Sequence, residues 1–277
     1  MTAALTEPTA PAQPTEGAQS VRRAFAILRA VATAQERGAR LIDIVKATDL
    51  NRPTVHRILK VLAEESAVEQ DPVTRRYFAG PEISLLGLAR TASFPVRALA
   101  EPFLRQLCDQ VGDTVFLSVR HGLDSIGIDR KTGHYPIQVL SIDIGARRPL
   151  GVGVSGVAIL ACLPPEEAAQ VMQANAKRLA LQRLSLPVLA SRVEAARQRG
   201  YAYAAVGVVP GTSAVAVPVM LPDGKVLAAV SVAAMADRLQ SHQLDATARL
   251  MTAQASSIAS RYLDVQRQRH HGVAASP

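Results

Sequence analysis

Three short helical patterns in residues 20–80 constrain the fold more than any other feature of this 277-residue chain. The first begins at Ser20, a good N-cap, the second covers residues 41–48, and the third begins at Asn51, a second good N-cap. Pro53 is tolerated in the first turn of the third helix, because the amides there lack helical partners. The expected buried stripes are Val21, Phe25, Leu28 and Val31 in the first helix and Val55, Ile58, Leu59 and Leu62 in the third.

A short hairpin pattern follows the three helices. Residues 68–70 and 75–78 have the composition of strands, and the Asp-Pro-Val-Thr segment at 71–74 is typical of a turn. Three helices followed by a hairpin are the layout of a winged helix-turn-helix, so we expect a DNA-binding domain over residues 20–80. Residues 1–19, rich in Pro, Thr and Ala, are expected to form a disordered arm.

Positive charge is concentrated in the helical part of this domain. Residues 20–63 contain nine basic and three acidic side chains, a net charge of +6 within 44 residues. This concentration is expected where a protein neutralises phosphates. A non-specific architectural DNA protein would be basic throughout, whereas residues 81–277 have a net charge of only +6 over 197 residues.

The side chains outside the buried stripe of the third helix are candidates for contact with bases. An α-helix fits the major groove, and its first residues reach the base edges. Arg52 suits guanine, Thr54 a thymine methyl group or a phosphate, and His56 a base edge or a phosphate. The alternative is a solvated helix face whose charges only keep the protein soluble. Arg57 and Lys60 further along the helix suit phosphates, and Arg75 and Arg76 in the hairpin suit the flanking backbone or the minor groove. The candidate DNA-contact residues are therefore Asn51, Arg52, Pro53, Thr54, His56, Arg57, Lys60, Arg75 and Arg76.

The rest of the chain predicts an α+β domain preceded by a linker helix. We expect the linker helix at residues 81–98, with an exposed Leu-rich face suited to a dimer partner, the second domain at 99–265, and a flexible tail at 266–277. Strands are expected at 114–119, 125–130, 137–142, 214–220 and 226–233. A final helix is expected to place Leu244, Ala248, Met251, Ala255, Ile258 and Tyr262 on one side.

Composition narrows the class of protein further. Two cysteines cannot form a disulfide framework or a four-cysteine zinc site. The first 19 residues lack the charged start and apolar core of a signal peptide. The cleanest apolar run, residues 150–163, is shorter than the roughly 18 residues that span a bilayer. We therefore expect a cytoplasmic protein with no membrane partner, no metal site and no cofactor.

An enzyme with an accessory nucleic-acid-binding domain is the alternative. His121, Asp124, Asp129 and His134 fall within 14 residues, but they show no helical metal motif and a solvated hairpin explains them better. The two cysteines lie in apolar helical contexts, which favours buried thiols. Residues 151–156 mimic a dinucleotide fingerprint without the βαβ pattern that it requires. The sequence therefore predicts no catalytic residue.

Seven segments together resemble the IclR-type (isocitrate lyase regulator) family of bacterial transcriptional regulators. Among them are S-V-R-R-A-F-A-I-L-R-A-V from residue 20, N-R-P-T-V-H-R-I-L-K-V-L-A-E-E from residue 51 and I-G-A-R-R-P-L-G-V-G-V-S-G-V-A-I-L-A-C-L-P-P-E-E from residue 144. The others are Y-F-A-G-P-E-I-S-L-L-G, R-Q-R-G-Y-A-Y, P-G-T-S-A-V-A-V-P-V and D-G-K-V-L-A-A-V-S-V-A-A. The resemblance implies a GAF-like effector-binding second domain, a homodimer or homotetramer, binding to double-stranded promoter DNA, and regulation by a small organic acid.

The resemblance also implies the positions of the effector site. The matching residues are Val154, Ser155, Ala204, Ala214, Ser231 and Ala233. The better-known glyoxylate- and pyruvate-type pocket has an acidic residue at the position of Ala204 and polar residues at those of Ala214 and Ala233. Three alanines make a roomier, more apolar cavity, so we expect an aromatic or longer-chain acid. Free amides where a helix begins near Ser155 would attract its carboxylate. The alternatives are a plain N-cap for Ser155 and a strand hydroxyl bonded to a carbonyl for Ser231.

Overall fold

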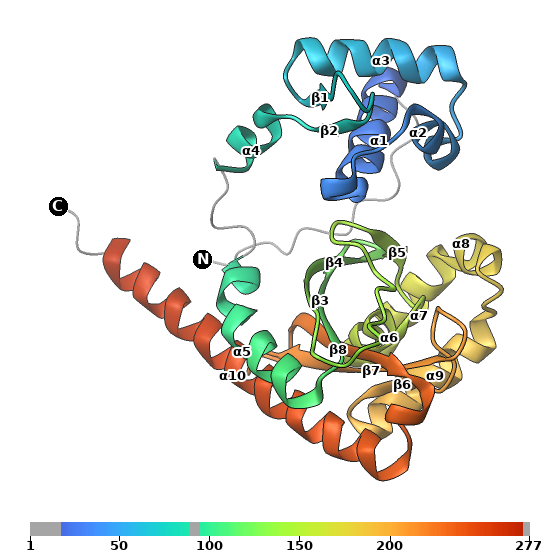
Figure 1. The fold of residues 1–277 in the computed structure, drawn as a ribbon. Helices are drawn as coiled ribbons and strands as arrows, with labels where there is room; N and C mark the ends of the chain where they lie inside the picture. Colours follow the sequence, from blue (N-terminus) through green and yellow to red (C-terminus); the bar gives the residue numbers. More distant parts are fainter. Residues whose placement is uncertain (1–17, 89–94, 274–277) are drawn as a thin grey trace, which may run out of the picture. The chain divides into compact units, whose positions relative to one another are not determined.

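The computed structural model describes residues 18–88 and 95–273, which belong to two compact units that divide between Arg90 and Thr91 (Figure 1). The expected disordered arm therefore lies almost wholly outside the described residues. Among the helices of the described residues, none is long and apolar enough to cross a membrane.

The N-terminal unit is a winged helix-turn-helix, as predicted. Its elements are α1 (Gln19–Ala34), the 3-10 turn η1 (Gln35–Arg37), α2 (Leu41–Thr48), α3 (Arg52–Glu64), β1 (Val68–Gln70), β2 (Tyr77–Ala79) and α4 (Pro81–Leu88). The two strands pair antiparallel, with Val68 opposite Ala79. The core of this unit is small, and its buried members are Ile27, Val31, Ala39, Ile44, Val55, Leu59, Val68 and Tyr77.

The start of α1 and part of its buried face differ from the prediction, because Leu28 and Val31 join the core as expected but Val21 and Phe25 do not. The helix begins at Gln19 with Ala18 as its N-cap, so Ser20 lies inside the helix. Val21 and Phe25 are 57% and 56% exposed, whereas Ile27 is fully buried. At 100° per residue, Phe25 lies roughly 160° around the helix axis from Ile27. Both faces carry apolar residues at helical spacing, and the packing against α2 and α3 selects the face of Ile27.

The C-terminal unit is built on one antiparallel six-stranded sheet. Its strands are β3 (Thr114–His121), β4 (Asp124–Lys131), β5 (Arg147–Pro149), β6 (Ala202–Ala204), β7 (Thr212–Met220) and β8 (Val226–Met235), in the order β5-β4-β3-β8-β7-β6. Its helices are α5 (Pro95–Val111), α6 (Val154–Cys162), α7 (Pro165–Ala174), α8 (Ala176–Leu181), α9 (Leu186–Arg199), the 3-10 turn η2 (Ala236–Arg238) and α10 (Ser241–Val273). This is the mixed α+β architecture that the sequence predicts.

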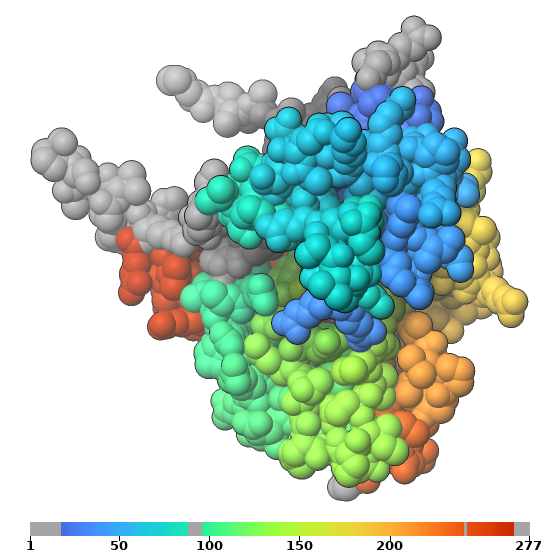
Figure 2. Space-filling view, turned by 45° about the horizontal axis from the view of Figure 1, so that its top comes forward, coloured from blue at the N-terminus to red at the C-terminus, as the bar shows by residue number. Residues whose placement is uncertain are grey.

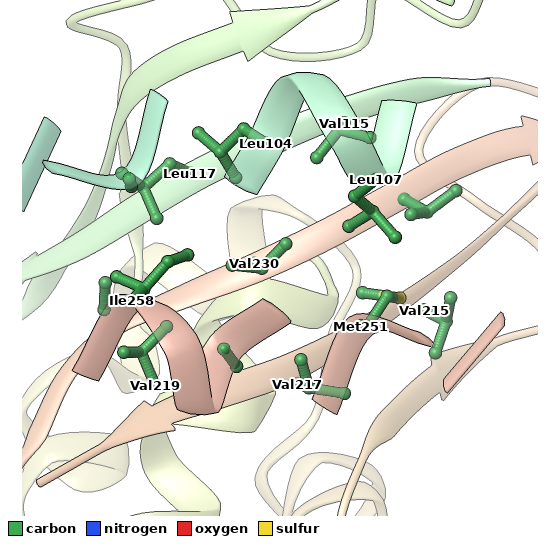
Figure 3. Close-up of a cluster of buried hydrophobic side chains, with 14 of the residues drawn as sticks. Leu104, Leu107, Val115, Leu117, Val215, Val217, Val219, Val230, Met251 and Ile258 are labelled. Atoms are coloured by element: carbon green, nitrogen blue, oxygen red, sulfur yellow. The ribbon is translucent and has the colours of Figure 1, made fainter. Parts of the chain in front are cut away.

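Two helical layers cover the two faces of this sheet. On one face α5 and α10 pack against alternate strand residues, including Val115, Leu117, Val217 and Val230 (Figures 1 and 3). On the other face α6 and α9 pack against Ala216 and Ala229. As predicted, α10 directs Leu244, Ala248, Met251, Ala255 and Ile258 into the first of these cores, with Tyr262 partly buried against it.

The structure also differs from the sequence-based elements after α4, where it adds the short strands β5 and β6. The segment 137–142 forms no strand; its Gln138 side chain instead donates to the carbonyls of Gly112 (3.1 Å) and Tyr135 (2.6 Å). These bonds hold the segment by a side chain rather than by backbone pairing. The predicted linker helix at 81–98 covers α4, residues 89–94 outside the described part, and the first turn of α5, where Val96 is already buried in the second unit. The expected tail at 266–277 is helical as far as residue 273, because α10 continues through it.

Candidate functional site

The first turn of α3 presents a row of exposed polar side chains. Asn51 is the N-cap, and its Oδ1 accepts a hydrogen bond from the Thr54 amide at 2.9 Å. The cap occupies that oxygen, so Asn51 positions the helix. Thr54 is half-buried, and the other predicted DNA-contact residues of α3 are exposed: Arg52, Pro53, His56, Arg57 and Lys60. In the space-filling view the light-blue α3 lies at the surface of its unit (Figure 2).

The turn of the wing is held by hydrogen bonds to Asp71, and its two arginines differ in their contacts. Asp71 Oδ1 accepts hydrogen bonds from the amides of Val73 and Thr74 and from the Thr74 hydroxyl, and these bonds hold the pKa of Asp71 below its usual value. Val73 at the tip is 86% exposed, and Arg75 is exposed with a left-handed φ of 57°. The wing therefore offers an apolar tip and one exposed guanidinium.

Arg76, the second arginine of the wing, is engaged inside the unit. Its Nη1 donates to the carbonyls of Arg37 at 3.0 Å and Gly38 at 2.9 Å. These bonds tie β2 to the turn between α1 and α2. Arg76 therefore holds the wing against the helices, a role that sequence reasoning missed.

A cavity of about 350 Å³ lies in the C-terminal unit and brings together all six residues that the resemblance assigned to the effector site. Val154 and Ser155 begin α6, Ala204 ends β6, and Ala214 lies on β7; Ser231 and Ala233 lie on β8. Phe116 of β3 adds an aromatic wall. The alternation of the strands turns these residues away from α5 and α10 and towards the cavity.

The two serines of the cavity are bonded to each other. Ser155 Oγ donates to Ser231 Oγ at 3.0 Å, and both residues are buried. Gly153, not Ser155, is the N-cap of α6, and no side chain caps this helix. Ser155 is therefore not an N-cap, and Ser231 bonds to a serine hydroxyl rather than to a backbone carbonyl. One hydroxyl hydrogen joins the pair, and the other is left to donate elsewhere.

The residues lining the cavity carry positive charge and no compensating acid. Arg148, Arg183 and Arg192 line it, and none of its lining residues is Asp or Glu. Arg183 and Arg192 are exposed, whereas burial lowers the pKa of Arg148 from its ordinary value. Sequence reasoning missed all three; the only signal was the Arg147-Arg148 pair before the glycine-rich segment.

Of the His and Asp residues considered as catalytic or metal-binding groups, Asp124, Asp129 and His121 contact basic side chains. Asp124 pairs with Arg178 at 2.6 Å, and Asp129 lies 3.4 Å from Lys131. His121 Nδ1 lies 3.4 Å from an Arg147 nitrogen. In residues 18–88 and 95–273 no three His, Cys, Asp or Glu side chains are grouped so that they could hold a metal ion.

Both thiols are expected to be unreactive in the folded protein. Burial raises the pKa of Cys162 to about 11 and also raises that of Cys108. At pH 8 roughly one Cys162 in a thousand is then a thiolate, which is the reactive form. A chromogenic disulfide reagent should therefore label almost no thiol in native buffer and both cysteines in guanidinium chloride. Rapid labelling of Cys162 in native buffer would contradict its assignment as a structural thiol.

Comparison with known proteins identifies both units. Residues 20–72 match the IclR helix-turn-helix domain, and residues 89–260 match the family described as bacterial transcriptional regulator IclR, C-terminal. The chain is 30% identical over 232 residues to the HTH-type transcriptional repressor AllR of Salmonella paratyphi A, covering 82% of this chain and 85% of that protein. It is 28% identical to the HTH-type transcriptional regulator XynR of Escherichia coli, covering 82% and 90%.

Solved structures share the fold. The IclR regulator from Alicyclobacillus acidocaldarius aligns with a TM-score of 0.67 and 24% identity, covering 87% of this chain and 98% of that one. An IclR homolog from Microbacterium hydrocarbonoxydans, complexed with 4-hydroxybenzoate, aligns with a TM-score of 0.68 and 21% identity, covering 88% and 98%. The matched family models and the sequence relatives are transcriptional regulators, which favours the regulator over the enzyme alternative. With both of its units matched, the chain belongs to the IclR family of transcriptional regulators.

Proposed function

We propose that this regulator binds promoter DNA through α3 and the wing, and that a small organic acid in the C-terminal cavity alters that binding. The cavity carries the proposal, because it unites six residues that lie on four different elements. The gene controlled would be one of catabolism, and the site of action the cytoplasm. Occupancy of the cavity would act on DNA binding through α5, which packs on the other face of the same sheet.

The DNA contacts we propose divide between bases and phosphates. Arg52 and His56 on the first turns of α3 would read base edges in the major groove, with Thr54 beside them. Arg57, Lys60 and the wing residue Arg75 would contact phosphates. Asn51 and Pro53 would set the start of the helix, and Arg76 would hold the wing in place.

A homodimer or homotetramer would place two such helices on one palindrome. The described part of α4 exposes Ile83, Leu85 and Leu86, of which Leu85 and Leu86 are 58% and 61% exposed. Neighbouring exposed apolar side chains of this size favour a protein partner. Half-sites roughly 34 Å apart, one turn of DNA, are the spacing that a two-fold dimer would read.

The cavity supports a single-ring aromatic acid as effector. Its volume of about 350 Å³ is at the small end of the range of roughly 300–1,000 Å³ for ligand sites. Phe116, Ala214 and Ala233 give it apolar walls, and its arginines favour an anion. The structural neighbour complexed with 4-hydroxybenzoate has a ligand of this class.

Fluorescence anisotropy with DNA tests the whole proposal. The probes are the intergenic DNA beside the gene and a scrambled control, titrated at two salt concentrations with and without a panel of aromatic acids. We expect tight, salt-dependent binding to the intergenic DNA that one acid changes. Equal binding to both probes, unaffected by any acid, would refute ligand-gated regulation.

Two arginine substitutions should separate base contacts from phosphate contacts. Arg52→Ala should cost about 1–3 kcal/mol on the specific DNA and relax its base preference. Arg75→Ala should weaken binding to specific and scrambled DNA alike and reduce the salt slope by about one. The measurement is a salt series of anisotropy titrations. Indistinguishable effects of the two variants would contradict the placement of α3 in the groove.

A further inference from the structure

The cavity contains a half-buried cationic group that forms no ion pair with any acid among the described residues. Arg148 lies on β5 at the edge of the sheet and lines the cavity. Asp143, the acid that influences it electrostatically, is exposed and lies 3.7 Å from Arg130. The positive charge of Arg148 is therefore available to a ligand.

The two terminal nitrogens of Arg148 differ in their partners. Nη2 donates to the backbone carbonyl of Ser141, which fixes the guanidinium plane. Nη1 is buried and has no hydrogen-bond partner within the described parts of the chain. Buried polar groups are nearly always paired in native proteins, and one that is not requires an explanation. A fixed guanidinium with one unpaired nitrogen is suited to an anionic oxygen.

Further donors lie beside this nitrogen. A β-carbon added at Gly153, the N-cap of α6, would stand 4.0 Å from Arg148 Nη1, so the guanidinium lies next to the start of that helix. The first amides of an uncapped helix point outward and attract negative charge. The hydrogen-bonded pair of Ser155 and Ser231 lines the same cavity and can donate one more hydrogen bond.

We infer that Arg148 is the carboxylate anchor of the cavity: its Nη1 and the amides at the start of α6 hold the carboxylate of the effector. The inference rests on the proposed function and extends it, because it assigns the charge recognition to one residue. The apolar walls then receive the body of the acid, and a neutral analogue of the same shape is rejected because it leaves Arg148 unpaired. The exposed Arg183 and Arg192 lie at the solvent side and attract anions from a distance.

Isothermal titration of the full-length protein tests the anchor. The probes are benzoate, 4-hydroxybenzoate and phenylacetate, each compared with its uncharged amide. The variants are Arg148→Gln, Arg148→Lys and the control Arg147→Gln, which removes the same charge from an exposed neighbour that does not line the cavity. Thermal unfolding of each variant checks that the fold is intact.

The wild-type protein should prefer one of the acids to its amide. Arg148→Gln should bind that acid about tenfold to a hundredfold more weakly and the amide nearly as before, the loss typical of a hydrogen bond to a charged group. Arg148→Lys should recover part of the affinity, and Arg147→Gln should match the wild type. Unchanged acid binding by a folded Arg148→Gln would overturn the anchor and leave the effector proposal intact. Failure of the wild type to bind any acid of the panel would refute the aromatic effector, and the anchor with it.

Discussion

Gly38→Ala should destabilise the N-terminal unit by about 2–5 kcal/mol and weaken DNA binding. Gly38 has a left-handed φ of 61°, which costs a residue with a β-carbon about 1–2 kcal/mol. That β-carbon would also stand 2.4 Å from Phe78 Cζ, and overpacking of this kind costs about 1–3 kcal/mol. The displaced ring lies on β2, next to the bonds of Arg76, so the wing should move as well.

Hydrogen–deuterium exchange measures this effect in each unit separately. Exchange should accelerate in α1, α2 and α3 and stay unchanged in the sheet of the second unit. Gly87→Ala is the matched control, because nothing lies within 4 Å of its added carbon and alanine favours a helix. If Gly38→Ala and Gly87→Ala exchange alike and bind DNA alike, the tight contact at Phe78 does not govern this unit.

Phe116→Ala should cost about 3–5 kcal/mol of stability in the C-terminal unit and impair effector binding. Phe116 is among the largest fully buried side chains and packs with Val139 and Ala233. Large-to-small substitutions in a core lose the transfer free energy and leave a void. Because the ring also lines the cavity, its loss removes an apolar wall from the ligand.

Leu104→Ala separates these two consequences of the Phe116 substitution. Leu104 lies on α5 and is fully buried against the face of the sheet opposite the cavity, so Leu104→Ala should cost about 2.7–5 kcal/mol of stability. It does not line the cavity, so the folded variant should bind the effector as the wild type does. Urea denaturation gives the stabilities, and calorimetric titration at a temperature where both variants are folded gives the affinities. Equal effector affinities in the two variants would exclude Phe116 from the ligand site.

Local sequence patterns predicted an element correctly where the pattern is compatible with only one kind of structure. Asn51 with Pro53 marked the start of α3, and the cap bond to Thr54 bears this out. The apolar, Val-rich segments 214–220 and 226–233 predicted the strands β7 and β8, and the apolar stripe of α10 predicted its buried face. The six cavity positions came from resemblance, because no local pattern connects residues so far apart in the chain.

Other features depend on choices that a local pattern leaves open. Val21 and Phe25 repeat at helical spacing as well as Ile27 and Val31 do, and only packing decides between the two faces. Residues 137–142 look like a strand, but the four hydrogen bonds of Gln138 replace a pairing partner. Arg147 and Arg148 are identical in type and adjacent, yet one is exposed and the other half-buried beside the cavity. Such a difference arises from tertiary burial, which a single sequence does not reveal.

The alternation along β8 gives this regulator two independent sets of adjustable positions. Ser231 and Ala233 face the cavity, whereas Val230 and Val232 pack under α5 and α10. Successive side chains of a strand point to opposite faces, so a substitution in one set leaves the other in place. Under the proposed function, a lineage can therefore exchange one chemical signal for another by point mutation while the layer packed under α5 and α10 stays intact.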